Sequence, residues 1–128
     1  MNFAKRVFQI AAIWGFLVIT PLFFLEEQMT VARPMAYPEN YYGFLAVTFA
    51  WQICFWLISR DPVRFRPIMI AAMIEKFPIL FIYLALWAQG RLAGPAIFFG
   101  VIDFVFGILF VISYLRTEDS PTPALANA

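Results

Sequence analysis

The chain has 128 residues, of which 63% are apolar and only 13% are charged, with a formal net charge of +1. A water-soluble domain carries about a quarter charged residues, so this composition argues against that class and predicts an integral membrane protein. The small net charge gives no indication of a nucleic-acid partner, and we predict none.

Two residue types that support common chemistries are scarce. The chain has no histidine, the commonest metal ligand and the usual general base at neutral pH. Its single cysteine, Cys54, cannot form an internal disulfide. We therefore predict no metal site and no cofactor, haem included. Any proton chemistry would fall to Asp, Glu, Lys or Tyr.

Four apolar segments have the length of a membrane span, which needs ~20 residues. The first, residues 7–25, follows two basic residues like a signal peptide. It is long and lacks a small-residue cleavage site, so we interpret it as an uncleaved anchor. The others cover residues 41–59, 67–89 and 95–115. A soluble amphipathic bundle would need polar helix faces, which the first and last segments lack.

The links between these segments are short or moderate, which indicates antiparallel neighbours. The predicted fold is therefore all-α, an integral membrane up-down four-helix bundle formed by residues 1–117. The polar end of the chain, residues 118–128, contains two prolines and is predicted to be a disordered tail.

Basic residues are unevenly divided between the two ends of the predicted bundle. The positive-inside rule places the richer end, with both termini, in the cytoplasm. That end has Lys5, Arg6, Arg60, Arg64, Arg66 and Arg116, whereas the other has Arg33 and Arg91. The loop arginines Arg60, Arg64 and Arg66 are candidates for binding anionic lipid headgroups, although a topology signal is the simpler explanation.

Three ionisable residues lie deep within the predicted spans: Glu75 and Lys76 in the third, and Asp103 in the fourth. A rise of 1.5 Å per residue puts them roughly 13–18 Å from the cytoplasmic ends. A lone charge at mid-bilayer costs about 3 kcal/mol on insertion scales. We therefore predict that Lys76 pairs with Asp103 across the bundle. Glu75 is then protonated, hydrogen-bonds Gln52 or shares the lysine.

Small and polar residues near these three charges are compatible with a ligand site at the same depth in the membrane. Gly100, Asp103 and Gly107 fall on one face of the fourth span, where small residues allow close helix approach. The alternative is a structural clamp that holds the third span to the fourth. The candidates for ligand binding or a proton path are Glu75, Lys76, Asp103, Gln52 and Tyr83.

Four stretches of the chain, within about residues 38–117, resemble a known group of proteins. They are "YPENYYGFLAVTFAWQ", "RDPVRFRPIMIAAMIEK", "AQGR" and "GVIDFVFGILFVISYLRT". The group comprises small four-span bacterial inner-membrane proteins of unknown function, broadly similar to the DoxX-like four-helix class. The resemblance implies a shared fold and a location in the bacterial cytoplasmic membrane. DoxX-like proteins are associated with redox and quinone-linked systems, but this chain lacks a cysteine pair or cofactor motif for that role.

Three functions remain open. The size of the chain and its lack of nucleotide or metal motifs favour a non-enzymatic accessory or assembly component, or a binder of a hydrophobic small molecule. Its partners would be the lipid bilayer, a hydrophobic ligand or another membrane protein, and a homo-oligomer is also open. The second function is a proton-coupled small-molecule transporter acting as an oligomer. The third is an intramembrane isomerase that uses Glu75 and Asp103 as acid and base.

Overall fold

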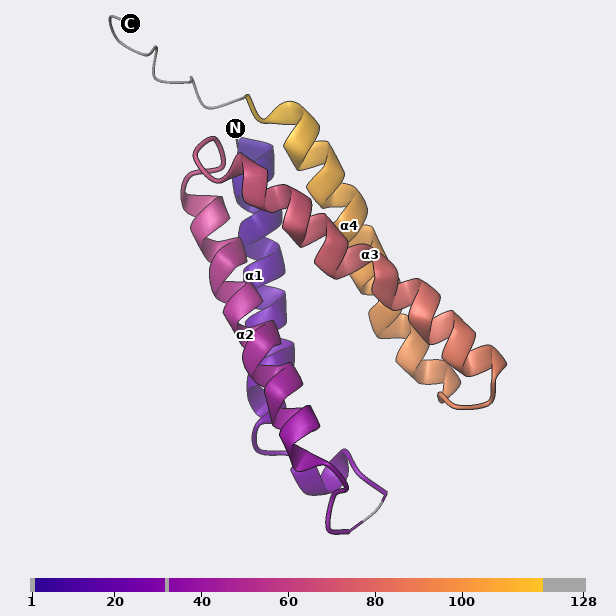
Figure 1. Cartoon of the computed structure of the whole chain (residues 1–128). Helices are drawn as coiled ribbons and strands as arrows, with labels where there is room; N and C mark the ends of the chain where they lie inside the picture. Colours follow the sequence, from indigo (N-terminus) through magenta and orange to yellow (C-terminus); the bar gives the residue numbers. More distant parts are fainter. Residues whose placement is uncertain (1, 32, 119–128) are drawn as a thin grey trace, which may run out of the picture.

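The computed structural model describes residues 2–31 and 33–118. Within these ranges the chain is all-helical, with four α-helices and two short 3₁₀ turns (Figure 1). The all-α prediction is therefore confirmed. In chain order the elements are α1 (Asn2–Leu22), η1 (Glu26–Gln28), α2 (Pro38–Arg60), α3 (Arg66–Ala88), η2 (Gly94–Ala96) and α4 (Ile97–Arg116). The predicted tail, residues 118–128, lies outside the described residues except for Glu118.

All four helices are long enough and apolar enough to cross a membrane, which indicates a multi-pass membrane protein. The bounds of α2, α3 and α4 lie within three residues of the predicted spans. The first prediction, residues 7–25, is displaced because α1 begins at Asn2 and ends at Leu22. Lys5 and Arg6 are part of the helix although they precede the apolar run. The limits of an apolar run therefore do not define the limits of a helix.

Proline and glycine mark several helix ends. Pro38 lies in the first turn of α2 and Pro67 in the first turn of α3, where a missing backbone N–H is tolerated. Gly90 follows α3 with a φ of 70°, the left-handed conformation that ends many helices. The connections are short or moderate in length, and each helix runs antiparallel to the one before it (Figure 1).

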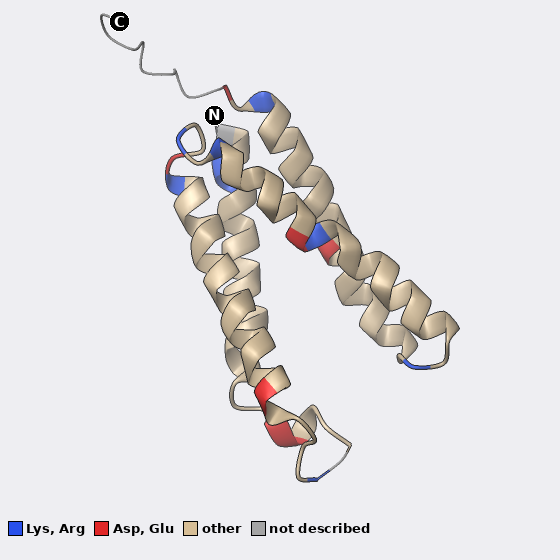
Figure 2. Cartoon of the chain, viewed as in Figure 1, with Lys and Arg blue, Asp and Glu red and all other residues tan. Residues whose placement is uncertain are grey.

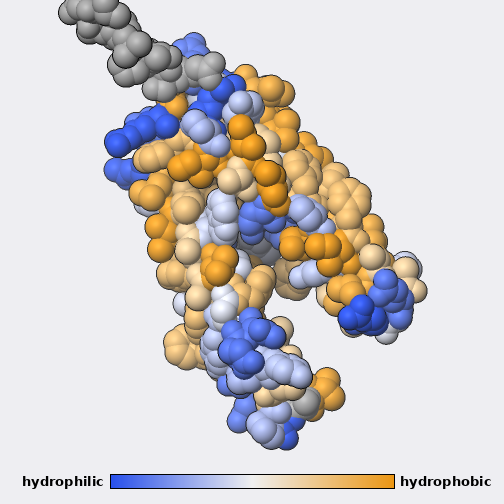
Figure 3. Space-filling view, in the orientation of Figure 1, coloured by the Kyte–Doolittle hydropathy of each residue, from blue (hydrophilic) through white to orange (hydrophobic). Residues whose placement is uncertain are grey.

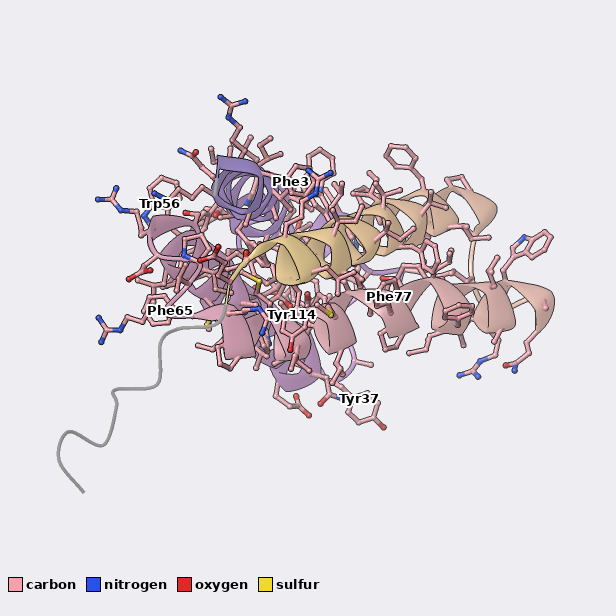
Figure 4. The ribbon with its side chains drawn as sticks, turned by 90° about the horizontal axis from the view of Figure 1, so that it is seen from above. Phe3, Tyr37, Trp56, Phe65, Phe77 and Tyr114 are labelled. Atoms are coloured by element: carbon pink, nitrogen blue, oxygen red, sulfur yellow. The ribbon has the colours of Figure 1, made fainter. Side chains whose placement is uncertain are left out.

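The four helices form two antiparallel hairpins, α1–α2 and α3–α4, which diverge from each other (Figure 1). The beginning of α1, the α2–α3 connection and the end of α4 gather at one end, which we name the closed end. At the other end, the open end, the tips of the hairpins stand apart. Seen from the closed end, α3 and α4 extend away from α1 and α2 (Figure 4). The up-down order is as predicted, but the hairpins do not pack against each other along their full length.

Buried aromatic rings hold the hairpins together at the closed end. Phe8 of α1 stacks on Phe110 of α4 with ring centroids 4.2 Å apart. Phe55 of α2 lies 5.2 Å from Phe110 by the same measure. All three rings are fully buried, and the small residues Ala11 and Ala72 lie in the same core. Three helices from both hairpins therefore share one packed aromatic centre.

The basic residues follow the same division. The six that were assigned to one end from the sequence lie at the closed end, and Arg33 and Arg91 lie in the connections at the open end (Figure 2). Arg60 and Arg64 are exposed. Arg66 instead donates a hydrogen bond from Nε to the carbonyl of Tyr114 at 3.1 Å, and its guanidinium lies 3.8 Å from the centre of that ring. It thus ties the start of α3 to the end of α4.

Candidate functional site

A cavity of about 930 Å³ lies between the two hairpins. Side chains from all four helices line it, and Met29 in the α1–α2 connection reaches it as well. The space-filling view shows the hollow between the two hairpins, with hydrophilic residues where the hairpins converge (Figure 3). Most of the lining is apolar, and its aromatic members are Trp14, Tyr41, Phe44, Tyr83 and Phe99.

The three ionisable residues of the predicted spans meet in this cavity, and we refer to Glu75, Lys76 and Asp103 as the charged triad. Lys76 Nζ donates a hydrogen bond to Asp103 Oδ1 at 3.1 Å. The same nitrogen lies 3.5 Å from Glu75 Oε2. The predicted pairing of Lys76 with Asp103 is confirmed, and Glu75 shares the lysine. Figure 2 shows these charges at mid-length on α3 and α4, in otherwise uncharged surroundings.

Two glycines of α4 allow the close approach on which this ion pairing depends. A Cβ atom on Gly100 would lie 3.2 Å from the backbone Cα of Leu80. One on Gly107 would lie 2.9 Å from the ring of Phe77, which projects from α3 toward α4 (Figure 4). Larger residues would therefore push α3 away from α4. Because the glycines flank Asp103, they keep its carboxylate within reach of Lys76.

The charges of the triad are unequally buried. Only 7% of the Lys76 side chain is exposed, compared with 20% for Glu75 and 24% for Asp103. The Lys76 ammonium also lies 5.3 Å from the ring centre of Phe55 and 5.9 Å from that of Phe106. The positive charge is therefore withdrawn toward the aromatic closed end. The side chains of Glu75 and Asp103 retain most of the accessible area that the triad presents.

Gln52 lines the same cavity but does not hydrogen-bond Glu75, which was one of the predicted options. Its Nε2 donates instead to the carbonyl of Thr48, one turn back on α2, at 2.9 Å. Such local side-chain bonds compete well with longer-range ones. The amide lies over Gly15 of α1, where an added Cβ would overlap it. Gln52 Oε1 and Glu75 Oε2 are buried and accept no hydrogen bond from the residues that the structure describes.

The cavity thus brings together all five candidates for a ligand site or proton path. Tyr83 lines it two turns beyond Lys76 on α3. The three headgroup candidates, Arg60, Arg64 and Arg66, lie away from it at the closed end. The contribution of α1 could not be predicted, because Trp14, Gly15 and Val18 belong to an uninterrupted apolar run. Within that run, Gly15 is the one residue that indicates close approach of a neighbouring helix.

Within residues 2–31 and 33–118, no three His, Cys, Asp or Glu side chains form a group that could hold a metal ion. No family model, curated protein or solved structure matches the chain. The resemblance to DoxX-like proteins therefore stays a prediction, and the site is interpreted from its own geometry.

Proposed function

We propose that this protein binds a hydrophobic small molecule in the cavity between its two hairpins. The observation that carries the proposal is a cavity of about 930 Å³ with apolar walls and a few polar groups where the arms converge. Ligand pockets in proteins typically measure ~300–1,000 Å³ and combine these two kinds of lining. The apolar part of a ligand would lie along the aromatic walls, and its polar part would reach the charged triad.

The proposed setting is the bacterial cytoplasmic membrane, with both termini in the cytoplasm. The concentration of basic residues at the closed end supports this orientation through the positive-inside rule. The open end then faces the opposite side of the membrane, and a lipid-soluble molecule could enter between the arms from the bilayer. An accessory or assembly role would be served by holding such a molecule for a partner protein.

The packing of the closed end favours binding over transport by a single chain. A transport path needs access from both sides of the membrane, and at the closed end Phe8, Phe55 and Phe110 are fully buried and pack on one another. A proton-coupled transporter would require rearrangement of this core or a path formed by an oligomer. The isomerase hypothesis requires both carboxylates to exchange protons with a substrate, whereas both are paired with Lys76 in this structure.

Photolabelling in lipid nanodiscs tests the binding proposal. The probe is a long-chain alcohol with an alkyl diazirine in its tail, and the labelled positions are identified by mass spectrometry. Two neighbouring pairs of residues provide internal controls. Val18 and Phe99 line the cavity, whereas Leu17 and Phe98, which are 69% and 60% exposed, are not part of its lining. We expect labelling of Val18 and Phe99 to saturate and to be blocked by excess decanol, while labelling of Leu17 and Phe98 rises linearly with probe.

A matched pair of variants checks that the cavity itself is responsible. Thr48→Phe would fill part of the cavity, and Val47→Phe would add the same ring at a position 62% exposed on the outer surface of α2. Saturable labelling should be lost in Thr48→Phe and retained in Val47→Phe. Non-saturable labelling at all four positions of the unmodified protein would contradict the proposed function.

A further inference from the structure

We propose that the head group recognised by this cavity is a cationic hydrogen-bond donor, such as the ammonium of a lipophilic amine. This inference rests on the proposed binding function and adds the chemical class of the ligand. It is carried by the unequal burial of the charged triad, by two buried acceptor atoms that accept no hydrogen bond within the described residues, and by the aromatic lining.

The first observation is the charge that the triad presents to the cavity. Two carboxylates and one ammonium sum formally to −1. All three side chains line the cavity, but that of Lys76 is only 7% exposed and its ammonium lies against the rings of Phe55 and Phe106, whereas the side chains of Glu75 and Asp103 are 20% and 24% exposed. Because two carboxylates outnumber the one ammonium, a head group that enters between the hairpins meets a net negative charge. An anionic head group would be repelled at this position.

The second observation is an excess of hydrogen-bond acceptors. Lys76 Nζ donates to Asp103 Oδ1, while Glu75 Oε2 lies at the longer distance of 3.5 Å and accepts no hydrogen bond within the described part of the chain. Gln52 Oε1, in a side chain that is 1% exposed, also has no such partner there. Buried acceptors without donors are unfavourable. A ligand that brings N–H donors would satisfy this requirement, and one that brings further acceptors would not.

The third observation is the aromatic character of the walls. Trp14, Phe44, Tyr83 and Phe99 come from four different helices and line the same cavity. Aromatic faces attract organic cations as well as apolar tails. The walls therefore favour a cation that carries hydrocarbon, in agreement with the charge and the acceptors at the triad.

Competition against the diazirine probe separates the contribution of the ligand's positive charge to binding from that of its hydrogen-bond donors. Four competitors with similar tails differ in the head group. Decylammonium has a positive charge and N–H donors, and decyltrimethylammonium has the charge without donors. Decanol has an uncharged hydroxyl that donates and accepts, and decanoate is anionic. The nanodiscs are zwitterionic, and concentrations are expressed per lipid so that partitioning into the bilayer is corrected. We expect decylammonium to protect Val18 and Phe99 at concentrations roughly tenfold to a hundredfold below decanol, because hydrogen bonds to charged groups are the stronger kind. Decyltrimethylammonium should fall between them, and decanoate should be weakest.

Glu75→Gln provides the matching test on the protein, since it reduces the formal charge of the triad to zero. The advantage of decylammonium over decanol should shrink by about tenfold. Glu27→Gln, on an exposed residue of η1, should preserve the advantage. Equal or better protection by decanol or decanoate in the unmodified protein would overturn this inference and leave the binding function intact. Failure of all four competitors to protect would overturn both.

Discussion

The closed end and the open end of this molecule use similar residues for opposite purposes. At the closed end, aromatic rings from α1, α2 and α4 pack directly on one another, and Phe8 and Phe110 stack at 4.2 Å between centroids. Toward the open end, the aromatic residues Trp14, Phe44 and Phe99 line the cavity of about 930 Å³. Apolar composition alone therefore does not distinguish core from cavity here. The distinction comes from where the two hairpins separate.

The charged triad lies at the boundary between these two regions. Lys76 contacts the aromatic rings Phe55 and Phe106, and all three members of the triad line the cavity. The triad thus serves two purposes: it ties α3 to α4, and it gives the cavity its polar end. A structural clamp and a ligand site, which were alternatives from the sequence, are compatible in this arrangement.

The largest expected effect comes from removing the only cation of the triad. Lys76→Met leaves the carboxylates of Glu75 and Asp103 buried together without a counter-charge. Breaking a buried ion pair in this way typically lowers the free energy of unfolding by about 3–5 kcal/mol. Unfolding by SDS titration in mixed micelles, followed by circular dichroism, measures the loss.

Two controls sharpen the result for Lys76. The triple variant Glu75→Gln, Lys76→Met, Asp103→Leu should recover most of the lost stability, because no buried charge remains. Lys5→Met makes the same chemical change at an exposed residue of the closed end and should stay within about 0.5 kcal/mol of the unmodified protein. A fully stable Lys76→Met protein would show that the carboxylates do not depend on the lysine.

The next effect concerns the aromatic packing of the closed end. Phe110→Ala removes a fully buried ring that contacts both Phe8 and Phe55. Such changes cost about 3–5 kcal/mol in water-soluble cores. We expect about 1–3 kcal/mol here, because transfer out of water contributes little to helix association in a bilayer. Phe98→Ala, at a ring 60% exposed on the same helix, should be nearly neutral in the same SDS titration, and equal losses would contradict the division into core and surface.

The smallest effect tests the contact between α3 and α4. Gly107→Ala places a Cβ 2.9 Å from the ring of Phe77, and the ring or the helix must shift to accommodate it. We expect the free energy of unfolding to fall by about 1 kcal/mol, the low end of overpacking effects. Gly43→Ala makes the same change on α2, where nothing lies within 4 Å of the added Cβ. It should be neutral or stabilising, because alanine is the better helix former, and the same sign for both variants would contradict this account.

Much of the fold could be predicted from the sequence because membrane spans are defined by length and apolarity. Three of the four spans agree with α2, α3 and α4 to within three residues. The pairing of Lys76 with Asp103 could also be predicted, because charges in hydrocarbon must find partners. Gly100 and Gly107 also indicated the contact face of α4, because small residues allow a neighbouring membrane helix to approach closely.

The cavity could not be predicted, because nothing in an apolar run distinguishes a residue that meets a helix from one that meets a space. Trp14 and Phe99 look like Phe8 and Phe110 in the sequence, yet the first two line the cavity and the others fill the core. The bond of Gln52 to its own helix was missed for a different reason. A side-chain amide reaches either a neighbour on its own helix or a group on another helix, and the spacing of residues does not decide between them.

The most direct test of this account is a pair of distance measurements between spin labels in nanodiscs, on a chain with Cys54 replaced by Ser. One pair, at Leu57 and Ile70, joins α2 to α3 near the closed end, and the other, at Val47 and Phe81, joins the same helices toward the open end. All four positions are exposed, so the labels should not disturb the core. We predict that the second distance is clearly longer than the first, because the hairpins diverge around the cavity. Equal distances would show two parallel hairpins without a cavity between them and would contradict the account.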